Sequence, residues 1–261
     1  MHNLLWFVCF LTLLFVNGAC KKDEAQLGPE PIPVPMGDER LLKQSSLHFG
    51  VDSIAYNADK MPERLLIAGP GDLVTMTYSG NIVTYRNLKF GKAFAKRVYE
   101  FENEVVKKST FYAVGKEGKE TESAANTYFY KDGKLIKDVY SATDPSVQGF
   151  YIEYFYDSAN ENVSVKKVHD KAGNLLEKTT FEYSDILDKS GFINQWTSNM
   201  DGTLFPRKSK YLKIKQVVEG NNSVQTSTFT YTLDAQGYVI KGKRVDDNGI
   251  QKETEWTNTW Q

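Results

Sequence analysis

The chain has 261 residues, of which 41% are hydrophobic, so it can bury a substantial core even after export and tether segments are set aside. Its formal net charge is −1, from 32 Lys and Arg against 33 Asp and Glu, which excludes the chain-wide positive field that nucleic-acid binding needs. The only cysteines are Cys9 and Cys20, so the region after residue 20 has no intrachain disulfide and no cysteine-ligated metal.

The first element is an export signal. Residues 4–16 form an apolar run that is too short to span a bilayer core of about 30 Å and suits the h-region of a signal peptide. The segment that follows, Asn17-Gly18-Ala19-Cys20, resembles a lipobox, in which small residues precede the cysteine that receives diacylglycerol. We expect a signal peptide at residues 1–19 and an acylated Cys20, with palmitate among its acyl chains. The alternatives are an ordinary secretory peptide and a buried hydrophobic segment.

Residues 20–44 are expected to form a lipidated tether. The run Lys21-Lys22-Asp23-Glu24 looks like the signal that carries lipoproteins of the Bacteroidota to the outer leaflet. Between Pro29 and Pro35 proline occupies alternate positions, which prevents helix and ladder formation and favours extended polyproline II. The sequence therefore predicts a lipid-anchored protein of the outer membrane that faces the exterior, with a periplasm-facing location as the alternative.

Residues 45–261 predict one all-β domain. Apolar residues alternate with polar ones in 74–78, and Ser79-Gly80-Asn81 turns the chain into the next strand. Further hairpin turns are predicted at 131–134 and 170–174, where Asp and Gly suit positive φ angles. Repeated hairpins must bury one face, so we expect a large antiparallel meander that forms a curled open sheet, an incomplete barrel or a sandwich.

The hairpins repeat along the chain and are interrupted once. The repeat unit is a strand rich in Tyr or Phe, a polar turn, and an aliphatic strand rich in Lys. Residues 190–208 break this periodicity and predict a long loop, in which Trp196 and Phe205 are candidates to plug the sheet. Tyrosines mark the repeat at a spacing of about 26 residues: Tyr130, Tyr156 and Tyr183.

Two resemblances follow from these hairpins. Tyr156-Asp157 and the segment 170–176 resemble the tyrosine-aspartate repeats of bacterial surface proteins. Ser209-Lys210-Tyr211-Leu212, followed by the hairpin residues 231–249, is similar to uncharacterised Bacteroidota lipoproteins whose β-meander domain has a porin-like, incomplete-barrel form. This second resemblance spans about residues 70 to 261. It implies a fold and no activity.

The sequence offers few groups for chemistry. The histidines after Cys20 are His48 and His169, which lack metal-ligand spacing, so we expect no metal and no cofactor. Motifs for nucleophilic catalysis or nucleotide binding are missing from the sequence. Paired carboxylates for hydrolysis stay open as an alternative, because such pairs form in space. The acidic run 246–249 is interpreted as a hairpin turn in preference to a Ca²⁺ loop.

The candidate ligand-binding residues are tryptophans. Trp256 and Trp260 fall on one face of the last strand, and spaced tryptophans can stack on sugars; Trp196 is a third candidate. The competing interpretation, which we favour, is that Trp256 and Trp260 close the core. The basic residues between 207 and 215 are interpreted as the wet side of a strand in preference to an anion site.

The sequence leaves three hypotheses about function open. The first is a non-catalytic surface module that binds a glycan, peptide or apolar ligand, the second is a structural or adhesive envelope protein, and the third is a carboxylate-dependent hydrolase. A membrane, through the lipid anchor, is the expected partner, and a glycan, a peptide or an envelope protein are the further candidates. Ser53 and Ser158 stand in the short Asp-Ser-apolar sequence at which Bacteroidota glycosylate exported proteins, and unmodified serines are the alternative.

Overall fold

The structure is a computed structural model. The expected signal peptide, Cys20 and almost all of the expected tether lie outside the residues it describes, as do His48, Trp196 and Phe205. Within the described part, no helix is long and apolar enough to cross a membrane. The described residues are 41–46, 51–67, 72–159, 161–190, 193, 204, 209–220, 222–247 and 252–260.

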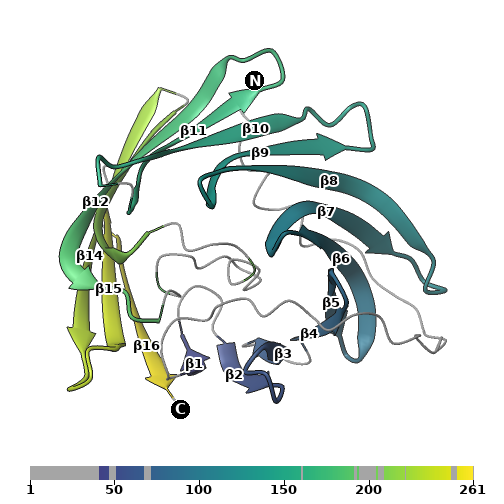
Figure 1. Cartoon of the computed structure of the whole chain (residues 1–261), viewed down its shortest axis with the longest axis horizontal. Helices are drawn as coiled ribbons and strands as arrows, with labels where there is room; N and C mark the ends of the chain where they lie inside the picture. The colour runs from purple at the N-terminus through teal and green to yellow at the C-terminus, as the bar shows by residue number, and fades with distance from the viewer. Residues whose placement is uncertain are drawn as a thin grey trace.

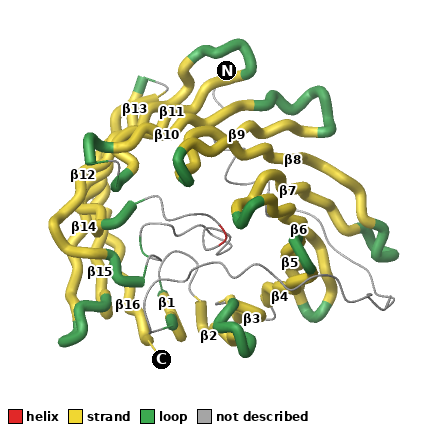
Figure 2. Tube along the Cα trace, in the orientation of Figure 1, coloured by secondary structure: helices red, strands yellow, loops and turns green. Residues whose placement is uncertain are grey.

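Sixteen antiparallel strands follow one another in chain order around a barrel (Figure 1). Short turns join most neighbours, as the tube in Figure 2 shows. The prediction of an all-β meander of repeated hairpins is therefore confirmed, and the barrel is the form it takes. The strands are β1 (Leu42–Ser45), β2 (Val51–Tyr56), β3 (Pro62–Ile67), β4 (Asp72–Ser79), β5 (Ile82–Lys89), β6 (Lys92–Glu102), β7 (Val105–Val114), β8 (Glu120–Lys131), β9 (Lys134–Ala142), β10 (Phe150–Tyr156), β11 (Val163–Asp170), β12 (Leu175–Leu187), β13 (Tyr211–Gly220), β14 (Ser223–Leu233), β15 (Val239–Asp247) and β16 (Lys252–Trp260).

One seam of the barrel is weak. β1 begins at Leu42, ahead of the expected domain start at residue 45, and pairs with the last strand through Leu42 and Trp260. A buried hydrogen bond of 2.7 Å from Ser45 Oγ to Asn258 Oδ1 strengthens this junction. On its other side β1 meets β2 at a single register pair, Ser45 with Val51. The barrel is thus nearly closed, and the junction of β1 with β2 is left unsealed.

The turns confirm the hairpin signals of the sequence. Asp132 and Gly133 join β8 to β9 with φ angles of 51° and 73°, the left-handed region that Asp and Gly tolerate. A different turn follows β11, where the Asp170 carboxylate accepts hydrogen bonds of 2.8 Å from both the backbone N–H and the side-chain amide of Asn174. These bonds hold the pKa of Asp170 below its usual range.

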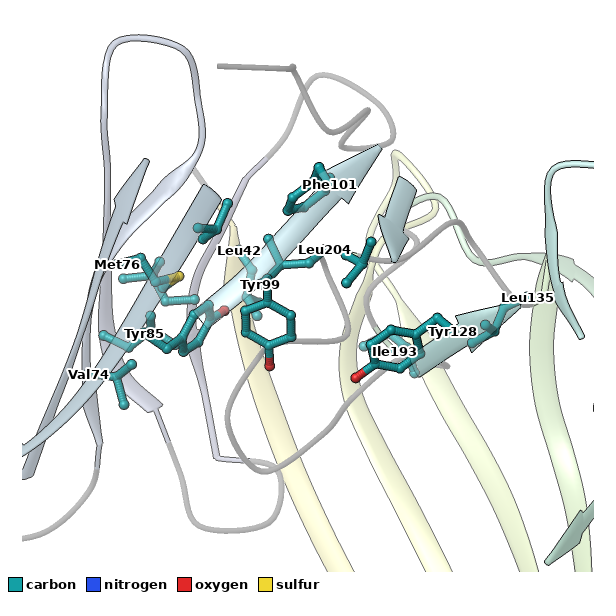
Figure 3. Packing of buried hydrophobic residues seen from close by; sticks show 14 of the residues in the cluster. Leu42, Val74, Met76, Tyr85, Tyr99, Phe101, Tyr128, Leu135, Ile193 and Leu204 are labelled. Carbon is teal, nitrogen blue, oxygen red and sulfur yellow. The ribbon is translucent and has the colours of Figure 1, made fainter. Parts of the chain in front are cut away.

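The core lies inside the barrel, because alternate residues of each strand point inward. In β4, Val74 and Met76 are buried, while Thr77 on the other face is exposed. Ile193 and Leu204, which lie between β12 and β13, belong to the same core, as Figure 3 shows. The predicted long loop therefore contributes to the plugging of the barrel through these two residues. The remaining buried members of the core are Leu42, Ile54, Leu65, Val83, Tyr85, Tyr99, Phe101, Val106, Tyr128, Leu135, Leu212 and Val239.

Candidate functional site inside the barrel

The two ends of the barrel interior differ in packing. Every second turn, from β2–β3 and β4–β5 to β14–β15, lies at the same end of the barrel. Most buried core residues lie within a few positions of these turns, so we call this end the packed end. Away from it, several inward-facing side chains of the β10 to β15 wall keep part of their surface exposed. Lys166 and Glu177, for example, retain 29% and 27% of their side-chain surface. The interior along this wall is therefore incompletely filled.

Tyrosine hydroxyls tie the strands together at the packed end. Tyr156 donates to the Leu135 carbonyl at 3.1 Å, and Tyr183 donates to the Val163 carbonyl at 2.8 Å. Tyr56, Tyr78 and Tyr231 make the same kind of bond, each to a carbonyl near the start of the preceding strand. Burial raises the pKa of Tyr156 and of Tyr183 to about 12. The sequence repeat at Tyr156 and Tyr183 is thus a structural clasp, and these phenols are unsuited to proton transfer near neutral pH.

The candidate site lies next to these clasps and is centred on Lys213. The register of β12 with β13 pairs Tyr183 with Lys213 and Glu182 with Lys215, with a bulge between the two pairs. Tyr183 faces inward, so Lys213 does too, whereas Lys215 and Glu182 form a 2.8 Å ion pair on the outer face. The prediction that these lysines lie on the solvent-facing side of the strand is therefore correct for Lys215 and wrong for Lys213, because the bulge reverses the alternation.

Lys213 sits among aromatic and polar groups. Its Nζ donates a hydrogen bond of 2.9 Å to Gln216 Oε1. The same nitrogen lies 4.5 Å from the ring centroid of Phe229 and 5.5 Å from that of Phe181. Burial lowers the pKa of Lys213 to about 8, and the positive charges of Arg244 and Lys166 add to the shift. Burial and these neighbouring charges make the ammonium form of Lys213 less favourable than it is in water.

Two ion pairs flank Lys213 on the inner wall. Lys166 of β11 lies 3.0 Å from Glu177 of β12, and Arg244 lies 2.6 Å from Asp246 within β15. Each carboxylate also accepts a hydrogen bond from a hydroxyl of a fully buried residue, Thr179 Oγ1 to Glu177 and Ser227 Oγ to Asp246. We call Lys166, Glu177, Lys213, Arg244 and Asp246 the inner charged cluster. It holds three cations and two carboxylates, a formal charge of +1.

A second polar group inside the barrel is densely packed. The Arg97 guanidinium donates to Ser109 Oγ at 3.0 Å and to the Tyr128 hydroxyl at 2.9 Å, and lies 3.9 Å from the Phe111 ring centroid. Ser109 and Tyr128 are buried. Polar groups that bond each other this closely stabilise a unique core. We assign this group a structural role.

The predicted tryptophan site is placed in the core. Trp256 faces inward and is 3% exposed, with its ring covering Gly242 on the neighbouring strand and meeting Tyr231 edge to face at 6.2 Å. Trp260 is partly buried and donates from Nε1 to the Val239 carbonyl at 2.9 Å. These contacts support the core-closing interpretation and leave Trp256 no free face for a sugar. Trp196 lies outside the described residues.

His169 and the two predicted glycosylation serines lie on the exterior. The His169 ring stacks on Tyr151 at 4.8 Å, and its Nε2 lies 3.3 Å from Glu153. Among the described residues, no group of three His, Cys, Asp or Glu side chains could hold a metal ion. Ser53 is exposed in β2, and Ser158 is exposed in the turn after β10.

Comparisons with known proteins match this fold. A porin-like protein from Bacteroides uniformis superposes with a TM-score of 0.60 at 15% identity, over 89% of this chain and 99% of the other. A porin-like protein from Bacteroides vulgatus superposes with a TM-score of 0.56 at 11% identity, over 84% of this chain and 97% of the other. No protein-family model and no curated protein matches the sequence. At these identities the likeness establishes the fold alone.

Proposed function

We propose that the chain is a lipid-anchored envelope protein whose barrel binds a ligand in its interior without chemical conversion. The observation that carries the proposal is the inner wall of β10 to β15. Several of its inward side chains are partly exposed, and they combine half-buried aromatic rings with the inner charged cluster. Ligand sites typically pair an apolar lining with a few polar groups held in place.

The outer face of the barrel favours a location outside the bilayer core. Ion pairs run across neighbouring strands on this face, as between Lys241 and Glu255 and between Lys243 and Glu253, both at 2.9 Å. A charged side chain on a lipid-facing strand costs about 2 to 4 kcal/mol at the bilayer midplane for Lys. The inside of the barrel, in contrast, is apolar at its packed end. A membrane-spanning barrel has an apolar band on its outer face, so the proposal places this barrel in water and assigns membrane attachment to the acylated Cys20.

The anchor is tested by metabolic labelling of the full-length chain. A palmitate analogue should label the wild-type chain, and Cys20→Ala should abolish both the label and recovery in the membrane fraction, while Cys9→Ala should be labelled normally after signal-peptide removal. Protease treatment of intact cells tests surface display, because an outward-facing barrel is cut without permeabilisation. A Cys20→Ala chain that stays labelled and membrane-bound would contradict the anchor.

A non-catalytic role is supported by how the inner carboxylates are used. Glu177 and Asp246 each form an ion pair with a neighbouring cation and accept a hydroxyl hydrogen bond. A general acid or base needs a carboxyl that can exchange its proton with substrate. Carboxylates engaged in this way hold their neighbours in position.

An adhesive role is the second candidate, and one observation favours it. Phe129, Ile136 and Phe155 are 46%, 36% and 43% exposed on the outer face of β8, β9 and β10. Exposed apolar side chains on adjacent strands can form a contact surface for another envelope protein. Crosslinking in intact cells, compared between the wild type and Phe129→Ser with Phe155→Ser, tests this role. Loss of a crosslinked partner in the double variant would support it, and an unchanged pattern would not.

Ligand binding itself is tested by thermal-shift screening of the full-length chain against glycans, peptides and small organic ligands. A ligand that binds the folded state alone raises the melting temperature in proportion to its saturation. The proposal predicts at least one such ligand whose effect depends on residues of the inner wall. A panel without any stabilising ligand would count against binding and favour the adhesive role.

A further inference from the structure

The inner charged cluster spans β11 to β15, and several apolar inward residues of the wall lie beside it. Lys213 and Gln216 stand beside Phe181 and Phe229. Further from the packed end, Val168 and Val218 share the inward face of β11 and β13 and are half-buried. A ligand on this wall therefore meets Lys213 close to the packed end and apolar side chains beside and beyond it, with Glu177 opposite Val168 on the neighbouring strand.

The charges of the cluster determine which ligand it suits. Glu177 and Asp246 are each held within ion-pair distance of Lys166 or Arg244, and Thr179 and Ser227 fix their orientation. The five charged groups sum to +1, since three cations face two carboxylates. A single negative charge neutralises the excess of these five groups, whereas a dianion such as phosphate would leave them with a net negative charge. The aromatic rings beside Lys213 favour an apolar body over a hydroxylated one.

We propose that this inner wall binds an organic monocarboxylate, with the carboxylate at Lys213 and Gln216 and an apolar body against Phe181 and Phe229. This inference rests on the proposed function, because it needs a barrel interior that admits a ligand. A carboxylate placed there accepts charge-assisted hydrogen bonds from Lys213 Nζ and the Gln216 amide in partly desolvated surroundings, where such bonds are strongest.

The test is calorimetric titration of the full-length chain at pH 7 with octanoate and benzoate as probes. Glucuronate, which is hydroxylated, and inorganic phosphate are titrated separately for comparison. The matched pair of variants is Lys213→Met and Lys215→Met, which remove neighbouring lysines on the inner and outer face. We expect octanoate or benzoate to bind the wild type and Lys215→Met with equal affinity. Binding to Lys213→Met should be weaker by roughly tenfold or more. Circular dichroism confirms that the variants are folded.

Each other outcome overturns the inference in a distinguishable way. If phosphate or glucuronate binds as well as octanoate, the site does not select an apolar monocarboxylate. If both lysine variants bind alike, the ligand is not held at Lys213. If octanoate and benzoate fail while another ligand from the thermal-shift panel binds, the inference fails and the proposed function stands. If every ligand fails, both fail.

Discussion

Lys213 and Lys215 are separated by one residue in β13, yet they lie on opposite faces of the barrel wall. The bulge opposite Glu182 and Tyr183 reverses the alternation, so Lys215 pairs with Glu182 in solvent while Lys213 enters the interior beside Lys166 and Arg244. Lys215 is exposed to solvent, whereas Lys213 is partly buried. Their substitution should therefore have opposite consequences for stability, and only the substitution of Lys213 should weaken binding.

Lys213→Met should stabilise the protein at pH 7. The lysine has a pKa of about 8 in the folded state against 10.5 as its ordinary value, so its ammonium form is penalised in the folded state. Removing it should raise the free energy of unfolding by about 1 to 3 kcal/mol, allowing for partial exposure. Lys215→Met, which breaks an exposed ion pair, should lower it by about 0 to 1 kcal/mol. Urea unfolding at pH 7 measures both.

The pH dependence of the free energy of unfolding tests the burial of Lys213 independently. Below pH 8 the folded and unfolded chains both hold the proton and the penalty is complete. Between pH 8 and pH 10.5 the unfolded chain binds more protons, so wild-type stability rises relative to Lys213→Met. Lys166, Glu177, Arg244 and Asp246 face Lys213 and are common to both chains. A stability difference that stays constant from pH 7 to about pH 9.5 would contradict the assigned burial of Lys213.

The tyrosine clasps should make the barrel sensitive to alkali. Burial raises the pKa of Tyr156 and Tyr183 to about 12 from the ordinary value of 10.0, so unfolded tyrosines ionise first. Their contribution is complete below pH 10 and is lost as the pH rises towards 12. Tyrosinate absorbance should therefore lag behind a free-tyrosine titration until the barrel unfolds. Tyr183→Phe should in addition cost about 1 kcal/mol, because the Val163 carbonyl loses its donor.

Gly242 is required by Trp256. A Cβ at residue 242 would lie 2.1 Å from Cζ2 of the Trp256 ring, so Gly242→Ala forces the tryptophan out of the core. We expect a loss of about 1 to 3 kcal/mol in the free energy of unfolding, and partial recovery when Trp256→Leu is added. Gly115→Ala is the control, since its Cβ meets only Lys119 O at 3.5 Å. Additive effects of Gly242→Ala and Trp256→Leu would argue against this contact.

The seam should be the least protected part of the barrel. β1 is four residues long and meets β2 at one register pair, whereas β12 and β13 share a long ladder. Hydrogen exchange should therefore be faster for the amides of β1 and the start of β2 than for those of β12 and β13. Ser45→Ala, which removes the bond to Asn258, should increase exchange in β1 further. Equal protection along all strands would show that the seam is sealed.

The fold could be predicted from sequence where patterns are local. Alternation in 74–78 and the turn at Asp132 and Gly133 each depend on neighbouring residues, and each was confirmed. Closure of the barrel depends on Leu42 meeting Trp260, a contact between the two ends of the domain that no local pattern encodes.

The candidate site was missed for a related reason. Strict alternation places Lys213 and Lys215 on one face, and a bulge is invisible without its partner strand. The inner charged cluster also joins residues from β11, β12, β13 and β15, which only the register brings together. Trp256 and Trp260 were candidates because spaced tryptophans can stack on sugars, and burial in the core accounts for Trp256.

The most direct test of the account is the reactivity of single cysteines in a chain with Cys9→Ser and Cys20→Ser. The cysteine of Val218→Cys lies on the inner wall and faces the barrel interior. The cysteine of Val217→Cys faces outward, and that of Met76→Cys lies in the packed core. A small charged thiol reagent should modify Val217→Cys and Val218→Cys but spare Met76→Cys in the folded state, and octanoate should protect only Val218→Cys. A Val218→Cys chain as inert as Met76→Cys would show that the barrel is filled and would contradict ligand binding in its interior.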